Sequence, residues 1–215
     1  VEILFCRFVL GFLALLVAFP RRLKLTERRQ EFFFISAGLS GVCLYYLLEN
    51  IALTYTLASN VGVMVAISPL FTMLLHQTLT RGKERLSPKF AIGFLLAISG
   101  ICLISFHGVS LQMNPVGDLL AVLAALCWSV YSLLTRKISQ FGYPTIQTTR
   151  RIFFYGIVLM LPALVICPCR WELSRFVEPV NLLNLLYLGL GASALCFVTW
   201  GFSVKVLGAV KTSVY

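Results

Sequence analysis

Residues 59–80, SNVGVMVAISPLFTMLLHQTLT, form an apolar stretch of helix length with a proline near its centre. Residues at every fourth position would form one slowly drifting stripe in a helix. They are Asn60, Met64, Ser68, Thr72 and His76. We expect this stripe to face protein or a wet cavity instead of lipid. Pro69 disturbs the backbone carbonyl of Val65, one turn earlier, and within a bilayer that carbonyl must find another partner.

The composition of the whole chain indicates an integral membrane protein. Of its 215 residues 59% are hydrophobic and 12% are charged, with a mean hydropathy of +0.91. Apolar runs of about 17 to 25 residues suffice to cross the hydrocarbon core as helices. The predicted spans are Ile3–Phe19, Phe32–Tyr55, Ala58–Leu79, Phe90–Phe106, Gly117–Leu134, Ile146–Ile166 and Leu182–Val204, with an eighth beginning near Leu207. The fold class is therefore an all-α, polytopic membrane helix bundle.

The net charge of +10 follows the loops and forms no single basic patch. Alternate connectors, around residues 21–29, 81–89, 136–151 and 205–211, carry most of the lysines and arginines. By the positive-inside rule these connectors are cytoplasmic. We predict a bacterial inner-membrane, multi-pass protein in a lipid bilayer, with no nucleic-acid partner.

Glu49 is the most informative single residue, because by residue count it lies well inside the hydrocarbon. An acidic side chain there costs at least a few kcal/mol unless it is paired, protonated or hydrated. Tyr45 lies one turn away on the same helix face. Two interpretations stay open, a residue lining a substrate path and a structural hydrogen bond between helices.

Aromatic residues supply the other candidates for a binding site. Trp128 and Tyr131 lie at i, i+3 and either line a cavity or anchor the helix at the membrane interface. Tyr155 and Trp200 are further aromatic candidates in later spans. Arg7, one turn inside the first span, either snorkels to the surface or lines an outer vestibule.

A GxSG pattern at residues 38–41 is also found in intramembrane serine proteases. Such an enzyme needs a histidine near the serine, whereas His76 and His107 are predicted far from Ser40 along the membrane normal. Small residues that allow close helix packing explain the pattern better. We therefore predict that the protein is not an enzyme, and keep an intramembrane hydrolase using Ser40 as the alternative from another class.

The chain contains a weak internal repeat. A shift of 151 residues places residues 38–64, GLSGVCLYYLLENIALTYTLASNVGVM, over residues 189–215, GLGASALCFVTWGFSVKVLGAVKTSVY, without a gap. The second span then corresponds to the seventh, five spans later, so the two copies have opposite orientations. Inverted repeats of this kind are typical of secondary transporters, with a site near the midplane between the halves.

Three stretches resemble the EamA family of the drug/metabolite transporter superfamily. They are ENIALTYTLASNVGVMVAISPLFTMLL, GKERLSPKFAIGFLLAISGICLI and GDLLAVLAALCWSVYSLLTRKI, supported by Arg7 and Phe8. The resemblance implies a ten-helix carrier made of two inverted five-helix repeats, truncated here at both ends. Residues 1–108 are then the first EamA repeat without its first helix, and residues 109–215 the second without its C-terminal helices. It also implies export of small metabolites such as amino acids or drugs.

We therefore expect a secondary transporter whose halves alternate around a central cavity. The expected lining residues are Tyr45, Glu49, Asn60, Ser68, Trp128, Tyr131, Tyr155 and Trp200, and Pro69 and Glu84 are expected to be structural. Glu49 would accept a substrate amine or a coupling proton, and Ser68 with the unpaired backbone beside Pro69 would bind polar groups. We expect a small-molecule substrate, coupling to a proton or counter-substrate, and no cofactor or metal; a homodimer stays open. Uptake, or transport of nucleotide sugars, are the alternatives within transport.

Overall fold

The computed structural model describes residues 1–80, 88–105, 114–166 and 178–214, and all regular structure in these ranges is helical. The elements are α1 (Glu2–Ala18), α2 (Gln30–Ala37), η1 (Gly38–Leu44), α3 (Tyr45–Tyr55), α4 (Ala58–Val65), α5 (Ser68–Leu79), α6 (Pro88–Ser105), α7 (Pro115–Ser139), α8 (Thr145–Ile166), α10 (Pro179–Leu186), η2 (Tyr187–Leu195), α11 (Cys196–Leu207) and α12 (Ala209–Val214), where η1 and η2 are π-helical. The predicted charge network around Glu84 lies outside the described residues.

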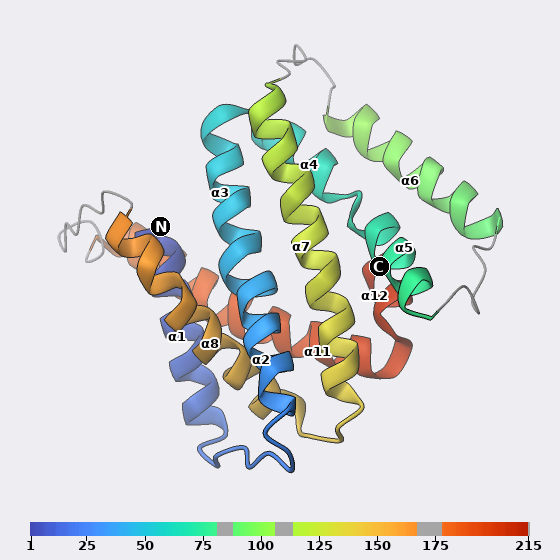
Figure 1. Ribbon diagram of the computed structural model, residues 1–215. Coiled ribbons are helices and arrows are strands. Elements are labelled where there is room, and N and C mark those ends of the chain that lie inside the picture. Colours follow the sequence, from blue (N-terminus) through green and yellow to red (C-terminus); the bar gives the residue numbers. More distant parts are fainter. Residues whose placement is uncertain (81–87, 106–113, 167–177, 215) are drawn as a thin grey trace.

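Five helical paths in the described residues are long and apolar enough to cross a membrane. They are residues 30–55, 58–79, 115–139, 145–166 and 179–207. Helices α1 and α6 occupy the positions of two further predicted spans. The connections after α1 and after α7 lie at the same end of the bundle (Figure 1). The prediction of an all-α polytopic bundle is confirmed.

The proline-centred stretch is divided at residues 66–67 into α4 and α5, and Pro69 lies in the first turn of α5. The hydroxyl of Ser68 donates to the carbonyl of Val65 at 2.5 Å. The expectation that the backbone beside Pro69 is unpaired is therefore wrong, because a side chain one residue before the proline replaces the missing amide. Asn60, Ser68 and Thr72 are buried, so the stripe faces protein.

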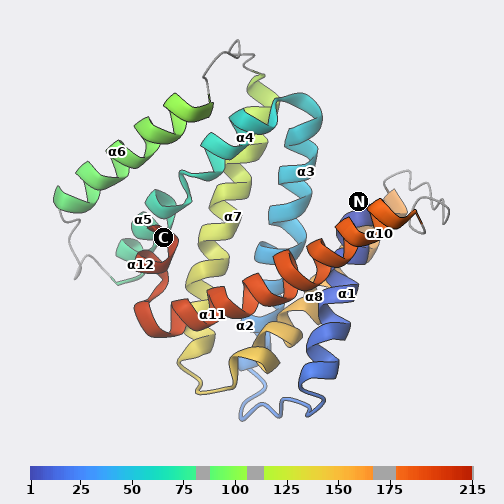
Figure 2. The same ribbon diagram turned by 180° about the vertical axis from the view of Figure 1, so that it is seen from behind.

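The two π-helices lie at equivalent positions of the internal repeat. The 151-residue shift superimposes the ends of η1 and η2, Leu44 and Leu195, and the starts of α4 and α12, Ala58 and Ala209. Figure 2 shows α10, η2 and α11 as one continuous path, the counterpart of α2, η1 and α3. The local irregularity of the helix is thus repeated together with the sequence pattern.

Helices α1 and α8 are a second equivalent pair. A shift of 145 residues places the buried face of α1 on that of α8. The buried residues of the two faces are Leu4, Phe8, Gly11 and Leu15 in α1, and Thr149, Phe153, Gly156 and Met160 in α8. Helix α1 packs against η2, and α8 packs against η1. In each crossing, a helix of one half therefore packs against the π-helix of the other half.

Glycines allow these two crossings to be close. A Cβ added at Gly38 would lie 2.8 Å from the backbone of both Ile152 and Gly156 on α8. In the equivalent crossing, a Cβ at Gly189 would lie 2.8 Å from Cβ of Leu10 on α1. In a membrane the association of helices depends on such close packing, since lipid and side chains are equally apolar.

Four rings fill the space between the two crossings, and we call them the central ring cluster: Phe8, Tyr46, Phe153 and Phe197. The Phe8 and Phe153 rings meet edge to face with centroids 5.2 Å apart. Phe8 contacts Tyr46 at 5.1 Å, and the equivalent pair, Phe153 and Phe197, lies at 5.0 Å. Edge-to-face pairs contribute about 0.5 to 1.5 kcal/mol each beyond the area they bury.

Helix α7 runs through the middle of the bundle, against α3, α5, η1 and α11, whereas α6 lies to one side (Figure 1). A Cβ at Gly41 would lie 2.3 Å from the ring of Tyr131, so this glycine makes room for the tyrosine. The Ser129 hydroxyl donates to the Ser68 carbonyl at 2.9 Å. The glycines of the GxSG pattern thus serve close helix packing.

We expect Gly38→Ala to destabilise the protein, because the new methyl group meets backbone atoms that cannot move aside cheaply. Overpacking of this kind costs about 1 to 3 kcal/mol. Thermal unfolding of the purified protein in detergent measures the effect. Gly62→Ala is the matched control, since a Cβ there has no neighbour within 4 Å. Equal melting temperatures for the two variants would contradict the close crossing of η1 and α8.

Candidate functional site

Four of the predicted lining residues come together beside the central ring cluster, and we call them the aromatic site: Tyr45, Trp128, Tyr131 and Trp200. The Trp128 ring is the hub, with centroids 5.0 Å from Tyr45, 5.0 Å from Tyr131 and 5.1 Å from Trp200. These residues come from α3, α7 and α11, so both halves of the repeat contribute. Tyr131 is only 1% exposed, which disfavours an anchor at the membrane interface.

A carboxylate and a guanidinium flank this group of rings. The Tyr45 hydroxyl donates to a Glu49 carboxylate oxygen at 3.3 Å. Arg7 Nε donates to Ser193 Oγ at 2.9 Å, and its Cζ lies 4.7 Å from the Tyr46 ring centroid. The region therefore holds one group of each sign against an aromatic wall.

Trp200 adds an unused hydrogen-bond donor. Its indole Nε1 is buried and has no acceptor among the described residues. A buried N–H without a partner costs about 1 to 3 kcal/mol. An acceptor supplied by a bound molecule would remove that cost.

Three predicted lining residues lie elsewhere. Asn60 donates to the Thr56 hydroxyl at 3.0 Å, next to the start of α4. The Ser68 hydroxyl donates to the carbonyl of Val65 at the end of α4, as described above. The Tyr155 hydroxyl donates to Glu31 on α2 and belongs to a separate cavity. The structure thus brings together five of the eight predicted residues and separates three.

Four further residues belong to the region. The sequence offered Arg7 as a possible vestibule residue, whereas it did not select Tyr46, Ser193 and Phe197. Arg7 was noticeable as a cation one turn inside a span, but the sequence did not show which neighbouring helix its side chain faces. Phe197 is the repeat counterpart of Tyr46 under the 151-residue shift. Comparing the two repeat copies position by position could have found both rings.

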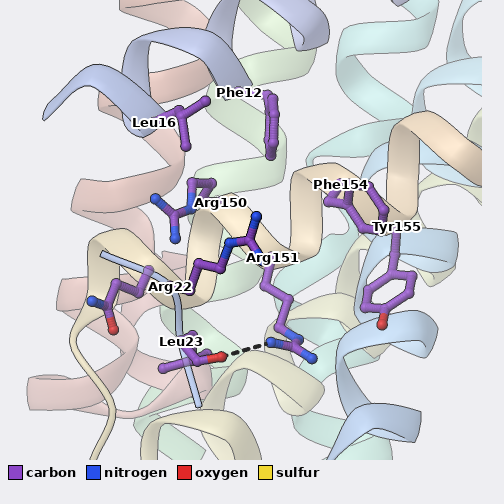
Figure 3. Close-up of a pocket in the computed structure, with 9 residues that line it drawn as sticks. Phe12, Leu16, Arg22, Leu23, Arg150, Arg151, Phe154 and Tyr155 are labelled. Carbon is purple, nitrogen blue, oxygen red and sulfur yellow. Dashed lines mark hydrogen bonds between the residues drawn. The ribbon is translucent and has the colours of Figure 1, made fainter. Parts of the chain in front are cut away.

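A cavity of about 540 Å³ lies between α1, α8 and the loop that follows α1. Figure 3 shows Phe12 and Leu16 of α1 on one side of it and Arg150, Arg151, Phe154 and Tyr155 of α8 on the other. Arg151 forms an ion pair with Glu31 at 2.5 Å and donates to the Leu23 carbonyl at 3.0 Å.

Another cavity, of about 270 Å³, opens at the other end of α1. Arg7 and Asn50 line it together with Glu2 and Leu188. Arg7 therefore lies between this opening and the aromatic site. Of the two interpretations of Arg7, a lining residue of the outer vestibule fits this position.

The described residues contain no group of three His, Cys, Asp or Glu side chains suited to a metal ion. The Ser40 hydroxyl donates to the Ser36 carbonyl at 2.8 Å, the usual bond of a helical serine to the preceding turn. That geometry does not resemble a serine activated by a base, as a hydrolase would require.

Comparison with known proteins gives the family. The model of the EamA-like transporter family matches residues 1–106 and 115–215. The chain belongs to the EamA-like transporter family. The resemblance seen in the sequence is confirmed: this is a family of transporters, and the described residues include five helices long and apolar enough to cross a membrane.

Relatives of the EamA chain include both uncharacterised and named transporters. YyaM of Bacillus subtilis (strain 168), an uncharacterized transporter, is 25% identical over 87% of this chain and 62% of its own length. A probable terminal-alkyne amino-acid exporter of Streptantibioticus cattleyicolor is 26% identical over 82% of this chain and 57% of its own. The aromatic amino acid exporter YddG of Ancylobacter novellus is 24% identical over 91% of this chain and 66% of its own length. The chain spans about three fifths of the length of the first curated relatives it matches.

A solved crystal structure has the same fold, with a TM-score of 0.75. The alignment covers 98% of this EamA chain and 74% of that chain, at 23% sequence identity. At this identity the likeness concerns the fold alone.

Glu31→Gln should lower the melting temperature of the EamA protein, because it removes the charge that pairs with Arg151. Both side chains are about a quarter exposed, at 26% and 27%, so the expected loss is about 1 kcal/mol or less. The double variant Glu31→Arg, Arg151→Glu should recover part of it. Thermal unfolding in detergent measures both, with Glu27→Gln in the adjoining loop as the control. An unchanged melting temperature for Glu31→Gln would show that this pair does not hold α2 to α8.

Ser40→Ala separates a transporter from an intramembrane hydrolase. Its hydroxyl bonds only within its own helix turn, so we expect transport in whole cells to be retained within about twofold. Alanine is also the better helix former at this position. Loss of all activity with unchanged expression would instead support a catalytic serine.

Proposed function

We propose that the protein is a secondary active transporter that exports small metabolites, with amino acids as the favoured class. The single observation that carries this proposal is the position of the aromatic site. Tyr45, Trp128 and Trp200 come from both inverted halves and meet beside the central ring cluster. Substrate sites of inverted-repeat transporters lie near the midplane at such an interface.

The chemistry of the site suits a zwitterion with an apolar side chain. Glu49 offers an anion for an ammonium group, and Arg7 offers a cation for a carboxylate. The rings of Trp128 and Trp200 supply the wall that an apolar or aromatic side chain needs. The names of two relatives, both amino-acid exporters, support the same substrate class.

Transport proceeds in this proposal by alternating access of the two inverted halves. Each half holds the π-helix of the other, so a rocking motion changes both crossings together. Glu49 either binds the substrate amine directly or carries a coupling proton; a counter-substrate replaces the proton in an exchanger. Tyr45 keeps the carboxylate oriented through its hydroxyl.

The proposed setting is the inner membrane of a bacterium, with the basic connectors in the cytoplasm. The bacterial relatives and the Lys/Arg distribution support it. A homodimer is compatible with the exposed apolar faces but is not required by the proposed mechanism. Two assays decide direction and substrate. Efflux is measured for a panel of amino acids, nucleotide sugars and drugs, and it is compared with uptake of the same compounds.

Glu49→Gln in the full-length protein should reduce amino-acid efflux at least tenfold or shift its dependence on pH. The amide keeps the shape and the Tyr45 contact but carries no charge for an amine and accepts no proton. Efflux from preloaded proteoliposomes between pH 5.5 and 8.5 measures both effects. Glu27→Gln, in an exposed loop, is the matched control. Wild-type efflux at every pH would remove Glu49 from the mechanism.

A further inference from the structure

The cavity between α1 and α8 combines two kinds of lining. One part is basic, with Arg22 from the loop and Arg150 and Arg151 from α8. The other part is apolar, with Phe12 and Leu16 from α1 and Phe154 from α8. Figure 3 shows the arginines below Phe12 and Leu16 in one opening.

The positive charge in this cavity is only partly balanced. Arg151 pairs with Glu31, the carboxylate that reaches the cavity among the described residues. Arg150 is 7% exposed, and its partners among the described residues are neutral, the carbonyls of Phe19 at 2.5 Å and Arg21 at 2.7 Å. Arg22 has no carboxylate partner in the described part of the chain. Two guanidinium charges are therefore left for an external anion.

A buried guanidinium without a counter-ion is costly, and a bound anion relieves that cost. Arginine recognises phosphate through two parallel hydrogen bonds, which suits a phosphate group better than a point cation would. Arg150 uses two of its five N–H donors on the carbonyls. Donors therefore remain for a ligand.

The apolar part of the cavity indicates what kind of phosphate fits. Phe154 is 48% and Leu16 is 37% exposed, side by side with the arginines. A free phosphate would leave these side chains uncovered, whereas the acyl chains of a lipid would lie against them. The cavity also lies at the end of the bundle with the basic connectors, which the positive-inside rule assigns to the cytoplasmic face. Basic pockets between membrane helices on that side bind anionic lipid headgroups.

We propose that the cavity between α1 and α8 binds one anionic phospholipid, with its phosphate on Arg22 and Arg150 and an acyl chain along Leu16 and Phe154. The bound lipid neutralises Arg150, which holds the loop after α1 through the Phe19 and Arg21 carbonyls. It thereby stabilises the loop that joins α1 to α2. The site is separate from the aromatic site and does not depend on the transport proposal.

Native mass spectrometry of the full-length protein in detergent tests the proposal. The protein is titrated with phosphatidylglycerol, with phosphatidylcholine of the same chains, and with inorganic phosphate. We expect one phosphatidylglycerol to be retained, bound at least tenfold more tightly than phosphatidylcholine. Arg22→Ala should weaken its binding roughly fivefold, about the contribution of one basic residue near a charged membrane surface.

Arg28→Ala is the matched control, because Arg28 is exposed in the same loop and does not line the cavity. Phe154→Ala should weaken phosphatidylglycerol binding and leave the binding of inorganic phosphate unchanged. Equal retention of the two lipids, or equal loss in Arg22→Ala and Arg28→Ala, would overturn the site. Full competition by inorganic phosphate would show a soluble anion instead of a lipid. The Arg22→Ala and Phe154→Ala variants replace exposed side chains, and the melting temperature of each without lipid checks that it is folded.

Discussion

The packing of the fold depends on two reciprocal helix crossings, α1 on η2 and α8 on η1. In water, burial of apolar surface would drive such contacts, but in a bilayer the alternative to a neighbouring helix is equally apolar lipid. Close approach of backbones and well-packed rings must supply the attraction. Gly38 and Gly189 provide the approach, and the central ring cluster fills the space between the crossings.

The site follows from this arrangement. Because each crossing joins the two halves, the residues just beyond the π-helices, such as Tyr45 and Tyr46, face the opposite half. The wider turn of a π-helix re-aims side chains, and such segments are frequent at functional sites. Arg7 from α1 then lies against the Tyr46 ring, and Glu49 from α3 accepts from the neighbouring Tyr45 hydroxyl. Packing and recognition thus use neighbouring parts of one interface.

The sequence was sufficient for the five spans that the described residues confirm and for the register of the repeat. Apolar length and the Lys/Arg distribution are local properties, and the 151-residue shift compares patterns that each copy keeps. Five of the predicted residues, among them Trp128 and Trp200, lie together in the structure, and the sequence singled them out because aromatic and acidic residues inside a span are unusual. The sequence did not show that Tyr155 lies away from the other predicted residues, because its position depends on a contact distant in sequence. Its hydroxyl bonds to Glu31, 124 residues away. The partner of the Val65 carbonyl was missed because a serine side chain, not the backbone, satisfies it.

Distances between spin labels in the full-length protein test the central claim, that the two halves alternate around the aromatic site. Labels at Asn50 and Val180 report one end of the bundle, and labels at Arg28 and Gln140 report the other; all four positions are exposed. Saturating transported substrate should shift the two distance distributions in opposite directions. Unchanged distances at both ends, in protein that still transports, would contradict alternating access between these halves.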